Sequence, residues 1–214
     1  MCRWPGLESW RGLLVLSLGL FAAQQGAGAA MIQGKAWLAP VLIERAWQQT
    51  LQQGGAVTKP WPWADTWPVA RLRVPALEVD LLVLAGDRGN ALAFGPGHAG
   101  ASAVPGTRGQ SVIAGHRDTH FAFLPELRLA DHVQLHLPDG EVRAYSIQAS
   151  RVIDSNIHQL TVQDSVESLL LVTCYPFHGL NSGGSLRYLV YATPATLVAG
   201  KVMGVDSKRT TFSL

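Results

Sequence analysis

Cys174 is the residue whose position first indicates chemistry. It ends the aliphatic run L-L-L-V-T-C at residues 169–174 and is followed by Tyr175 and Pro176, so it stands where a strand leaves the core. The chain has 214 residues and two cysteines, and Cys2 lies near its start. Because these two residues are expected on opposite sides of a membrane, we predict a free thiol. Cys174 is then either a small buried hydrophobic residue or a nucleophile, and the second role needs a nearby cation or base.

Two further side chains occupy similar positions at strand ends. His116 follows the strand S-V-I-A-G, and Arg187 opens the apolar strand L-R-Y-L-V. If the three strands are neighbours, a thiol, an imidazole and a guanidinium share one rim of the fold. The imidazole would then transfer protons, and the guanidinium would donate hydrogen bonds to a carbonyl oxygen or an oxyanion. The pattern alone is equally consistent with a core cysteine, a loop histidine and an ordinary strand arginine.

The histidine spacing argues against a metal site. His116 and His120 are four residues apart, as are His132 and His136. Val133 and Leu135 alternate with the second pair as in a strand, where residues four apart are separated by roughly 13 Å. Two cysteines cannot form a four-thiolate site. We therefore predict no metal and no cofactor.

Composition and periodicity predict a mainly β fold. The chain is 48% hydrophobic and 15% charged with a net charge of +2, which favours a packed core and argues against nucleic acid as a partner. Short runs of β type are separated by Gly and Pro, and P-D-G at residues 138–140 predicts a hairpin turn. Helical segments are few, at 121–127 and 163–168. Many short strands with few helices indicate a closed barrel or a sandwich. The predicted strands cover residues 69–74, 77–84, 111–114, 132–137, 141–153, 169–174 and 186–192.

The amino-terminal segment is predicted to be a targeting segment. Residues 12–32 are mostly apolar and long enough to span a bilayer, and Arg3 and Arg11 would lie in the cytoplasm. We favour an uncleaved membrane anchor over a signal peptide cut after Ala29. A helix is expected over residues 39–53, with Pro40 in its first turn, lying on the bilayer or on the domain. The linker that follows contains Trp61, Trp63 and Trp67, which suit a membrane interface or a cover over a barrel end.

Three motifs resemble those of the sortase family. The stretch L-V-T-C-Y-P-F resembles the sortase cysteine motif, V-I-A-G-H-R-D resembles the histidine motif, and S-L-R-Y-L-V-Y-A resembles the arginine strand. The three occur in the family's order, and the resemblance covers about residues 69–194. The apolar start, the segment G-K-A-W-L-A-P and the composition look most like the sortases of Gram-negative proteobacteria.

The resemblance implies a fold and an activity. The fold would be a sortase-type eight-stranded β-barrel with short helices, preceded by the anchor helix. The activity would be transpeptidation at an LPxTG-like C-terminal sorting signal of secreted proteins, with a thioacyl intermediate on Cys174 and transfer to an amine acceptor in the cell envelope. His116 would protonate the leaving amine, Arg187 would hold the substrate and help stabilise the oxyanion, and Thr173 and Tyr175 would contribute to substrate binding.

These inferences give a domain plan and two rival functions. We predict an anchor or signal peptide at 1–32, a helix and linker at 33–68, the catalytic barrel at 69–197 and a tail at 198–214. The protein would be held in the inner membrane by a single N-terminal span, with the barrel facing the periplasm. The rivals are a hydrolytic cysteine peptidase, which uses water as acceptor, and a membrane-tethered β-barrel that binds a peptide or lipid without catalysis.

Overall fold

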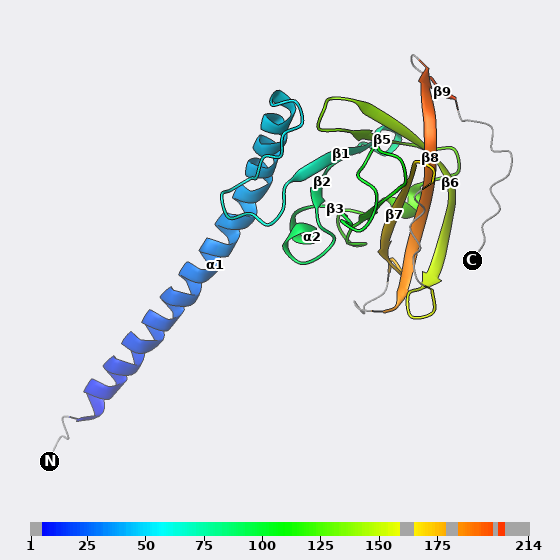
Figure 1. Cartoon of the computed structure of the whole chain (residues 1–214). Coiled ribbons are helices and arrows are strands. Elements are labelled where there is room, and N and C mark those ends of the chain that lie inside the picture. The colour runs from blue at the N-terminus through cyan, green and yellow to red at the C-terminus, as the bar shows by residue number, and fades with distance from the viewer. Residues whose placement is uncertain (1–5, 159–164, 179–183, 199–200, 204–214) are drawn as a thin grey trace. The chain divides into compact units, whose positions relative to one another are not determined.

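The computed structural model describes residues 6–158, 165–178, 184–198 and 201–203 (Figure 1). The chain forms two units, residues 1–41 and 42–214. Helix α1, Gly6–Gln52, runs from the first unit into the second. The remaining helical elements are short: α2 at Asn90–Phe94 and single 3₁₀ turns at Pro75–Leu77 and Leu124–Glu126.

The amino-terminal unit differs from the sequence prediction in two ways. Pro40 lies inside α1 and not in its first turn, so the expected start of a separate helix at residue 39 was wrong. Several large apolar side chains of this unit, including Leu13, Val15 and Phe21, are exposed. Among the described residues, no helix combines the length and the apolar character that crossing a membrane requires, so the predicted span at residues 12–32 is not supported.

The strands of the second unit form a closed barrel. Their order is β6-β5-β1-β2-β3-β4-β7-β8-β9, and β6 also pairs with β8, which closes strands β1 to β8 on themselves. The long strands β6 and β8 run side by side (Figure 1), and β9 pairs antiparallel with the end of β8. The strand bounds are β1 Pro68–Val74, β2 Val79–Ala85, β3 Gly97–His98, β4 Gln110–Ala114, β5 His132–His136, β6 Val142–Asp154, β7 Ser168–Cys174, β8 Leu186–Val198 and β9 Lys201–Met203.

The prediction of a mainly β barrel is confirmed, and each predicted strand overlaps an observed one. The turn at 138–140 also forms, because the N–H of Leu137 donates to the carbonyl oxygen of Glu141 at 2.8 Å. The sequence missed α2, β3 and β9. Of the helix predicted at 121–127, only a 3₁₀ turn at Leu124–Glu126 is present. Residues 163 and 164 of the other predicted helix lie outside the described residues, and Ser168 begins β7.

The core consists of the inward-facing residues of the barrel. Strand β1 alternates buried and half-buried residues along its whole length, as a strand with one core face must. Strands β4 and β7 are buried at most positions, because they lie inside the sheet. The largest fully buried side chains of the barrel core include Tyr145, Phe121, Leu72, Ile113 and Leu171.

The last turns of α1 pack on the barrel. Ile43 contacts Leu84 and Ala91, and Trp47 is fully buried. Glu44 forms an ion pair with Arg71 of β1 at 2.9 Å. Of the expected alternatives, residues 42–52 therefore lie on the domain.

The tryptophans of the linker are placed differently from one another. Trp61 packs edge to face on Phe94, with ring centroids 5.9 Å apart, and so covers part of the barrel surface. Trp63 is 82% exposed and makes no such contact with the core. The covering role that the sequence suggested therefore applies to Trp61.

Candidate active site

The parallel pairing of β4 with β7 brings His116 and Cys174 together. Parallel strands end at the same edge of a sheet, and here Ala114 is the register partner of Val172. The pairing continues beyond the strand, because the N–H of Gly115 donates to the carbonyl oxygen of Val172 at 3.0 Å. His116 and Cys174 each lie two residues beyond the Ala114–Val172 pair, so both are placed at the same end of the barrel.

Arg187 joins the pair from the other side of β7. Strand β8 is antiparallel to β7, and Cys174 is the direct register partner of Arg187. Nη1 of Arg187 donates hydrogen bonds to the carbonyl oxygens of Gly184 at 2.6 Å and Leu186 at 2.9 Å. The guanidinium therefore lies at the same barrel end as the thiol, bound to its own strand.

The three candidate side chains at this end of the barrel are all at least partly accessible to solvent. Cys174 is half-buried, His116 is exposed and Arg187 is half-buried. A half-buried thiol remains accessible, unlike an inert cysteine walled into the core. A thiol and an imidazole at one barrel end are the two groups that nucleophilic catalysis with general acid–base assistance uses.

Thr173 and Tyr175 flank the cysteine and differ in environment. Thr173 is 3% exposed, and its hydroxyl donates to the carbonyl oxygen of Gly115 at 2.7 Å. Its side chain thus links β7 to the chain after β4. The N–H of Tyr175 donates to the carbonyl oxygen of Leu186 at 3.0 Å, so an oxyanion would have to share or displace this bond.

The turn after β4 is shaped by Gly115 and Phe121. The N–H of Phe121 donates to the carbonyl oxygen of His116 at 2.9 Å, which closes the turn that presents the imidazole. A Cβ at Gly115 would lie 2.8 Å from two ring carbons of Phe121, which is fully buried. The glycine before the histidine is therefore needed for close packing.

Arg117 is a residue of the site that sequence reasoning missed. It is 7% exposed although both neighbours in the chain, His116 and Asp118, are exposed. Its Nη1 donates to the carbonyl oxygen of Pro176 at 2.6 Å, and its Nε donates to the Asp118 carboxylate at 3.1 Å. No pattern in the sequence indicates this burial, because the turn has no periodicity that shows which side chain points inward.

A groove lies next to the cysteine. Its volume is about 620 Å³, and two loops form its walls. One wall comes from the loop after His116, with Arg117, Asp118, Ala122, Pro125 and Glu126, and the other from residues 175–178 after Cys174. The two candidate reactive residues therefore stand at the starts of the two loops that bound the groove.

An aromatic cluster stands over the second wall. Tyr175 packs edge to face on Phe177 with ring centroids 6.1 Å apart, and Phe177 packs on Tyr188 at 5.2 Å. Tyr188 was not singled out from the sequence, although it is the register partner of Thr173. The cluster gives the site an apolar side.

The other histidines near the motifs have separate environments. His98 is buried, and its Nε2 contacts the carbonyl oxygen of Ala103 at 2.9 Å, which indicates a structural role. Burial lowers the pKa of His120 below its ordinary value, and the charge of His116 lowers it further. His178 is exposed on the groove wall.

Within the described ranges, no group of three His, Cys, Asp or Glu residues is placed to hold a metal ion. His132 and His136 lie at opposite ends of β5, as the strand interpretation predicts.

Comparison with known proteins agrees with the fold and the motifs. A family model described as the sortase domain matches residues 72–195. Sortase D of Bacillus subtilis (strain 168) is 34% identical over 126 residues, which is 58% of this chain and 63% of that protein, so the match spans less than two thirds of the relative's length.

Solved structures share the architecture. Sortase A from Corynebacterium diphtheriae superposes with a TM-score of 0.57 at 21% identity, over 86% of this chain and 98% of that chain. A Clostridium perfringens Sortase D5 transpeptidase gives 0.58 at 19% identity, over 73% and 98%. At such identities the likeness concerns the fold alone. Since the family model matches more than half of the chain, this protein belongs to the sortase family.

Proposed function

We propose that this protein is a cysteine transpeptidase that cleaves an LPxTG-like C-terminal sorting signal of secreted proteins and transfers the cleaved protein to an amine acceptor. The observation that carries the proposal is the meeting of His116, Cys174 and Arg187 at one barrel end, in a chain of the sortase family. His116 follows β4, Cys174 ends β7 and Arg187 lies near the start of β8, so only the fold brings them to one end.

The proposed reaction has two covalent steps. The sulfur of Cys174 attacks the carbonyl carbon of the signal's threonine, the peptide C–N bond breaks, and His116 gives a proton to the departing amine. An acceptor amine then loses a proton to His116 and attacks the thioester carbon, which forms a new amide and releases the thiolate. Arg187 would donate hydrogen bonds to the oxyanion that develops in each step, after leaving the carbonyl oxygens of Gly184 and Leu186.

The surroundings of the thiol support transfer to an amine over hydrolysis. A thioester survives longer when water is partly excluded from its site. The cluster of Tyr175, Phe177 and Tyr188 provides an apolar side next to Cys174. The groove beyond it offers room for a second substrate. Thr173 and Tyr175 remain proposed contributors to substrate binding.

The test uses the full chain in nonionic detergent. The protein is incubated with a peptide that contains an L-P-x-T-G segment, with and without triglycine, and products and intact protein mass are measured. We expect a ligated product with triglycine and a peptide fragment bound to Cys174 as a thioester. Cys174→Ala is the matched control and should give neither.

Other results would contradict the proposal in distinguishable ways. Cleavage at the same rate with no ligated product would identify a hydrolytic cysteine peptidase. Peptide binding without any adduct on Cys174, equal in wild type and Cys174→Ala, would identify a binding module. Absence of cleavage across a panel of L-P-x-T-x peptides would exclude an LPxTG-like signal.

For cellular location we propose the inner membrane of a Gram-negative bacterium, with the barrel in the periplasm. The support is the exposed apolar side chains of α1 between Leu13 and Phe21, together with the arginines that precede them. Fractionation of cells should recover the protein with membranes, and external protease should digest the barrel only after the outer membrane is opened. Recovery in the cytosolic fraction would contradict this location.

A further inference from the structure

Arg117 is a buried cation in the loop that carries His116. Its exposure is 7%, whereas the side chains before and after it face solvent. A buried guanidinium cannot lose its proton and must be satisfied by acceptors. Two of these acceptors are known: the carbonyl oxygen of Pro176 at 2.6 Å from Nη1, and the carboxylate of Asp118 at 3.1 and 3.3 Å from Nε.

The bond to Pro176 connects the two loops that carry the proposed reactive groups. Pro176 lies two residues after Cys174, and Arg117 lies one residue after His116. Charge-assisted hydrogen bonds of this kind are short and stronger than neutral ones. The guanidinium therefore fixes the start of the loop after β7 against the turn after β4.

A second bond fixes the same two chains on the other side of the reactive pair. The hydroxyl of Thr173 donates to the carbonyl oxygen of Gly115 at 2.7 Å. Thr173 and Gly115 immediately precede Cys174 and His116. The pair is thus bracketed: one cross-chain bond lies just before both residues, and the other lies just after them.

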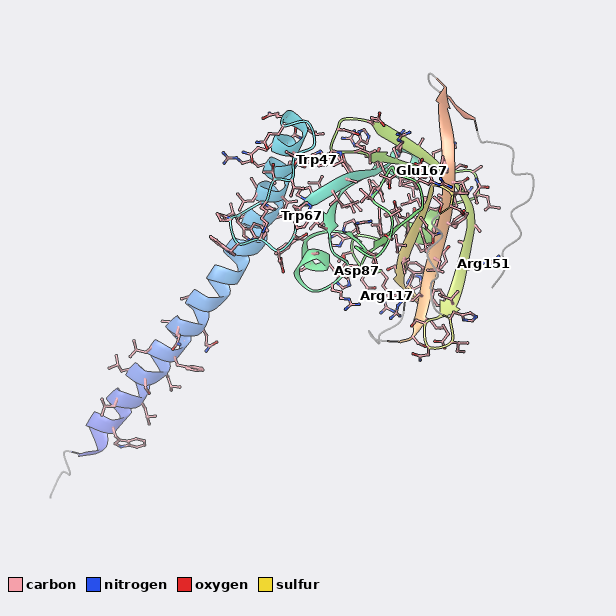
Figure 2. All side chains as sticks on the ribbon, in the orientation of Figure 1. Trp47, Trp67, Asp87, Arg117, Arg151 and Glu167 are labelled. Carbon is pink, nitrogen blue, oxygen red and sulfur yellow. The ribbon has the colours of Figure 1, made fainter. Side chains whose placement is uncertain are left out.

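These two cross-chain hydrogen bonds matter because neither reactive side chain is held by packing on all sides. His116 is exposed and Cys174 is half-buried, so their separation is set by their backbones. A displacement of about 1 Å in a catalytic pair can lower a rate by about 100-fold. Arg117 is well suited to prevent it, because its planar fork can bond to two acceptors at once. Figure 2 labels Arg117 among the side chains of the barrel.

We propose that Arg117 is a positioning residue that holds His116 at the working distance from Cys174 by binding the carbonyl oxygen of Pro176. The inference rests on the proposed function, in which these two residues exchange protons with the substrate. Asp118 orients the guanidinium from the solvent side. In this role Arg117 acts through the backbones of the two loops and not on a reacting atom.

The test compares four variants of the full chain in detergent. Arg117→Met removes the donors and keeps most of the apolar stem. Arg117→Lys keeps the charge and one donor, and Asp118→Asn weakens the orientation of the guanidinium without changing a buried residue. Arg128→Met is the matched control, because Arg128 is an exposed arginine in the same connection between β4 and β5.

Two readouts separate positioning from mere folding. The first is kcat and KM for ligation of the L-P-x-T-G peptide to triglycine. The second needs no substrate: the rate of alkylation of Cys174 by iodoacetamide as a function of pH, with His116→Gln as reference. A thiol coupled to a nearby imidazole reacts with a different pH profile from an isolated thiol, whose pKa is about 8.5.

We expect Arg117→Met to lower kcat by about 100-fold with little change in KM, and its alkylation profile to approach that of His116→Gln. Arg117→Lys should recover part of the loss, Asp118→Asn should fall between Arg117→Lys and wild type, and Arg128→Met should match wild type. If Arg117→Met does not fold, Arg117→Lys and Asp118→Asn test the proposal, because both proteins keep a charged group at position 117.

Other outcomes overturn the inference. It fails if the folded Arg117 variants keep the wild-type kcat and alkylation profile, or if KM rises with kcat unchanged. It also fails if wild type and His116→Gln share one profile, since there is then no coupling to maintain. Failure of the proposed function looks different: wild type would form no adduct and no ligated product, whatever the alkylation profiles show.

Discussion

Cys174 and Arg187 lie opposite each other in the antiparallel ladder between β7 and β8. The next residue on each side continues the contact, because the N–H of Tyr175 donates to the carbonyl oxygen of Leu186 at 3.0 Å. Strand β8 is itself held from the other side, where Arg187 pairs with Ile153 of β6. The backbone position of the arginine relative to the thiol is therefore fixed by the barrel, and only its side chain has to turn.

Replacing Arg187 by lysine tests whether the guanidinium stabilises the transition state. We expect kcat for ligation to fall by about 100- to 1000-fold, because one ammonium cannot present the fork of donors that an oxyanion needs. Steady-state kinetics with the L-P-x-T-G peptide and triglycine measure this. Arg143→Lys on the exposed side of β6 is the control and should leave kcat unchanged. Wild-type kcat in Arg187→Lys would rule out the proposed role.

Gly115→Ala tests the packing that shapes the histidine turn. The added Cβ would lie 2.8 Å from ring carbons of Phe121, which is fully buried and cannot move away without disturbing the core. We expect the free energy of unfolding to fall by about 1–3 kcal/mol, as overpacking does elsewhere. Urea titration measures it. Gly100→Ala is the control, because a Cβ there meets nothing within 4 Å, and equal stability of the two variants would contradict the argument.

Thr173→Val tests the cross-chain hydrogen bond that precedes the reactive pair. The substitution conserves shape but removes the donor to Gly115, whose carbonyl then loses a partner in a buried region. We expect a loss of about 1–3 kcal/mol in the free energy of unfolding, with a smaller loss for Thr173→Ser, which keeps the hydroxyl. The same urea titration compares the two. A Val variant as stable as the Ser variant would show that this bond contributes nothing.

His136 makes the stability of the fold depend on pH near neutrality. Burial lowers the pKa of His136 below its ordinary value of 6.5, and the charge of Arg73 lowers it further. The unfolded chain therefore binds a proton at a pH where the folded chain does not. The free energy of unfolding must then fall as pH drops below about 6.5, until the lower folded-state pKa is passed.

The measurement is urea unfolding at several values of pH between about 5.5 and 7.5, around the ordinary pKa of histidine. His136→Gln should reduce the slope of stability against pH. Part of the slope should persist in His136→Gln, because burial also lowers the pKa of His120. An unchanged slope in His136→Gln would contradict the assignment.

The strands could be predicted because their signal is local. Buried and half-buried residues alternate in β1, and β4 and β7 are aliphatic runs. Both patterns can be recognised from consecutive residues of the sequence. Strand β3 has only two residues, Gly97–His98, which is too short for any period to show. Pro40 misled the prediction of α1, because proline favours a first helical turn yet here lies within a continuous helix.

The site could be predicted only in part. The positions of His116, Cys174 and Arg187 at strand ends are visible in the sequence, and the family motifs strengthen the choice. Which strands are neighbours is a long-range property, so the pairing of β4 with β7 had to come from the structure. The inward orientation of the Arg117 side chain likewise depends on a carbonyl acceptor at Pro176, which lies 59 residues later in the chain. The domain boundaries, the sorting signal and the acceptor amine stay predictions.

A polypeptide still on the ribosome lacks the assembled pair. The two segments that the hydroxyl of Thr173 joins to Gly115 are 58 residues apart, and the strand that carries Arg187 is made later still. A half-made chain therefore contains no Cys174 at all, and His116 waits for its partner until β7 has been made. The proposed thioester cannot form before that point, and Arg187 becomes available to the oxyanion only when β8 follows.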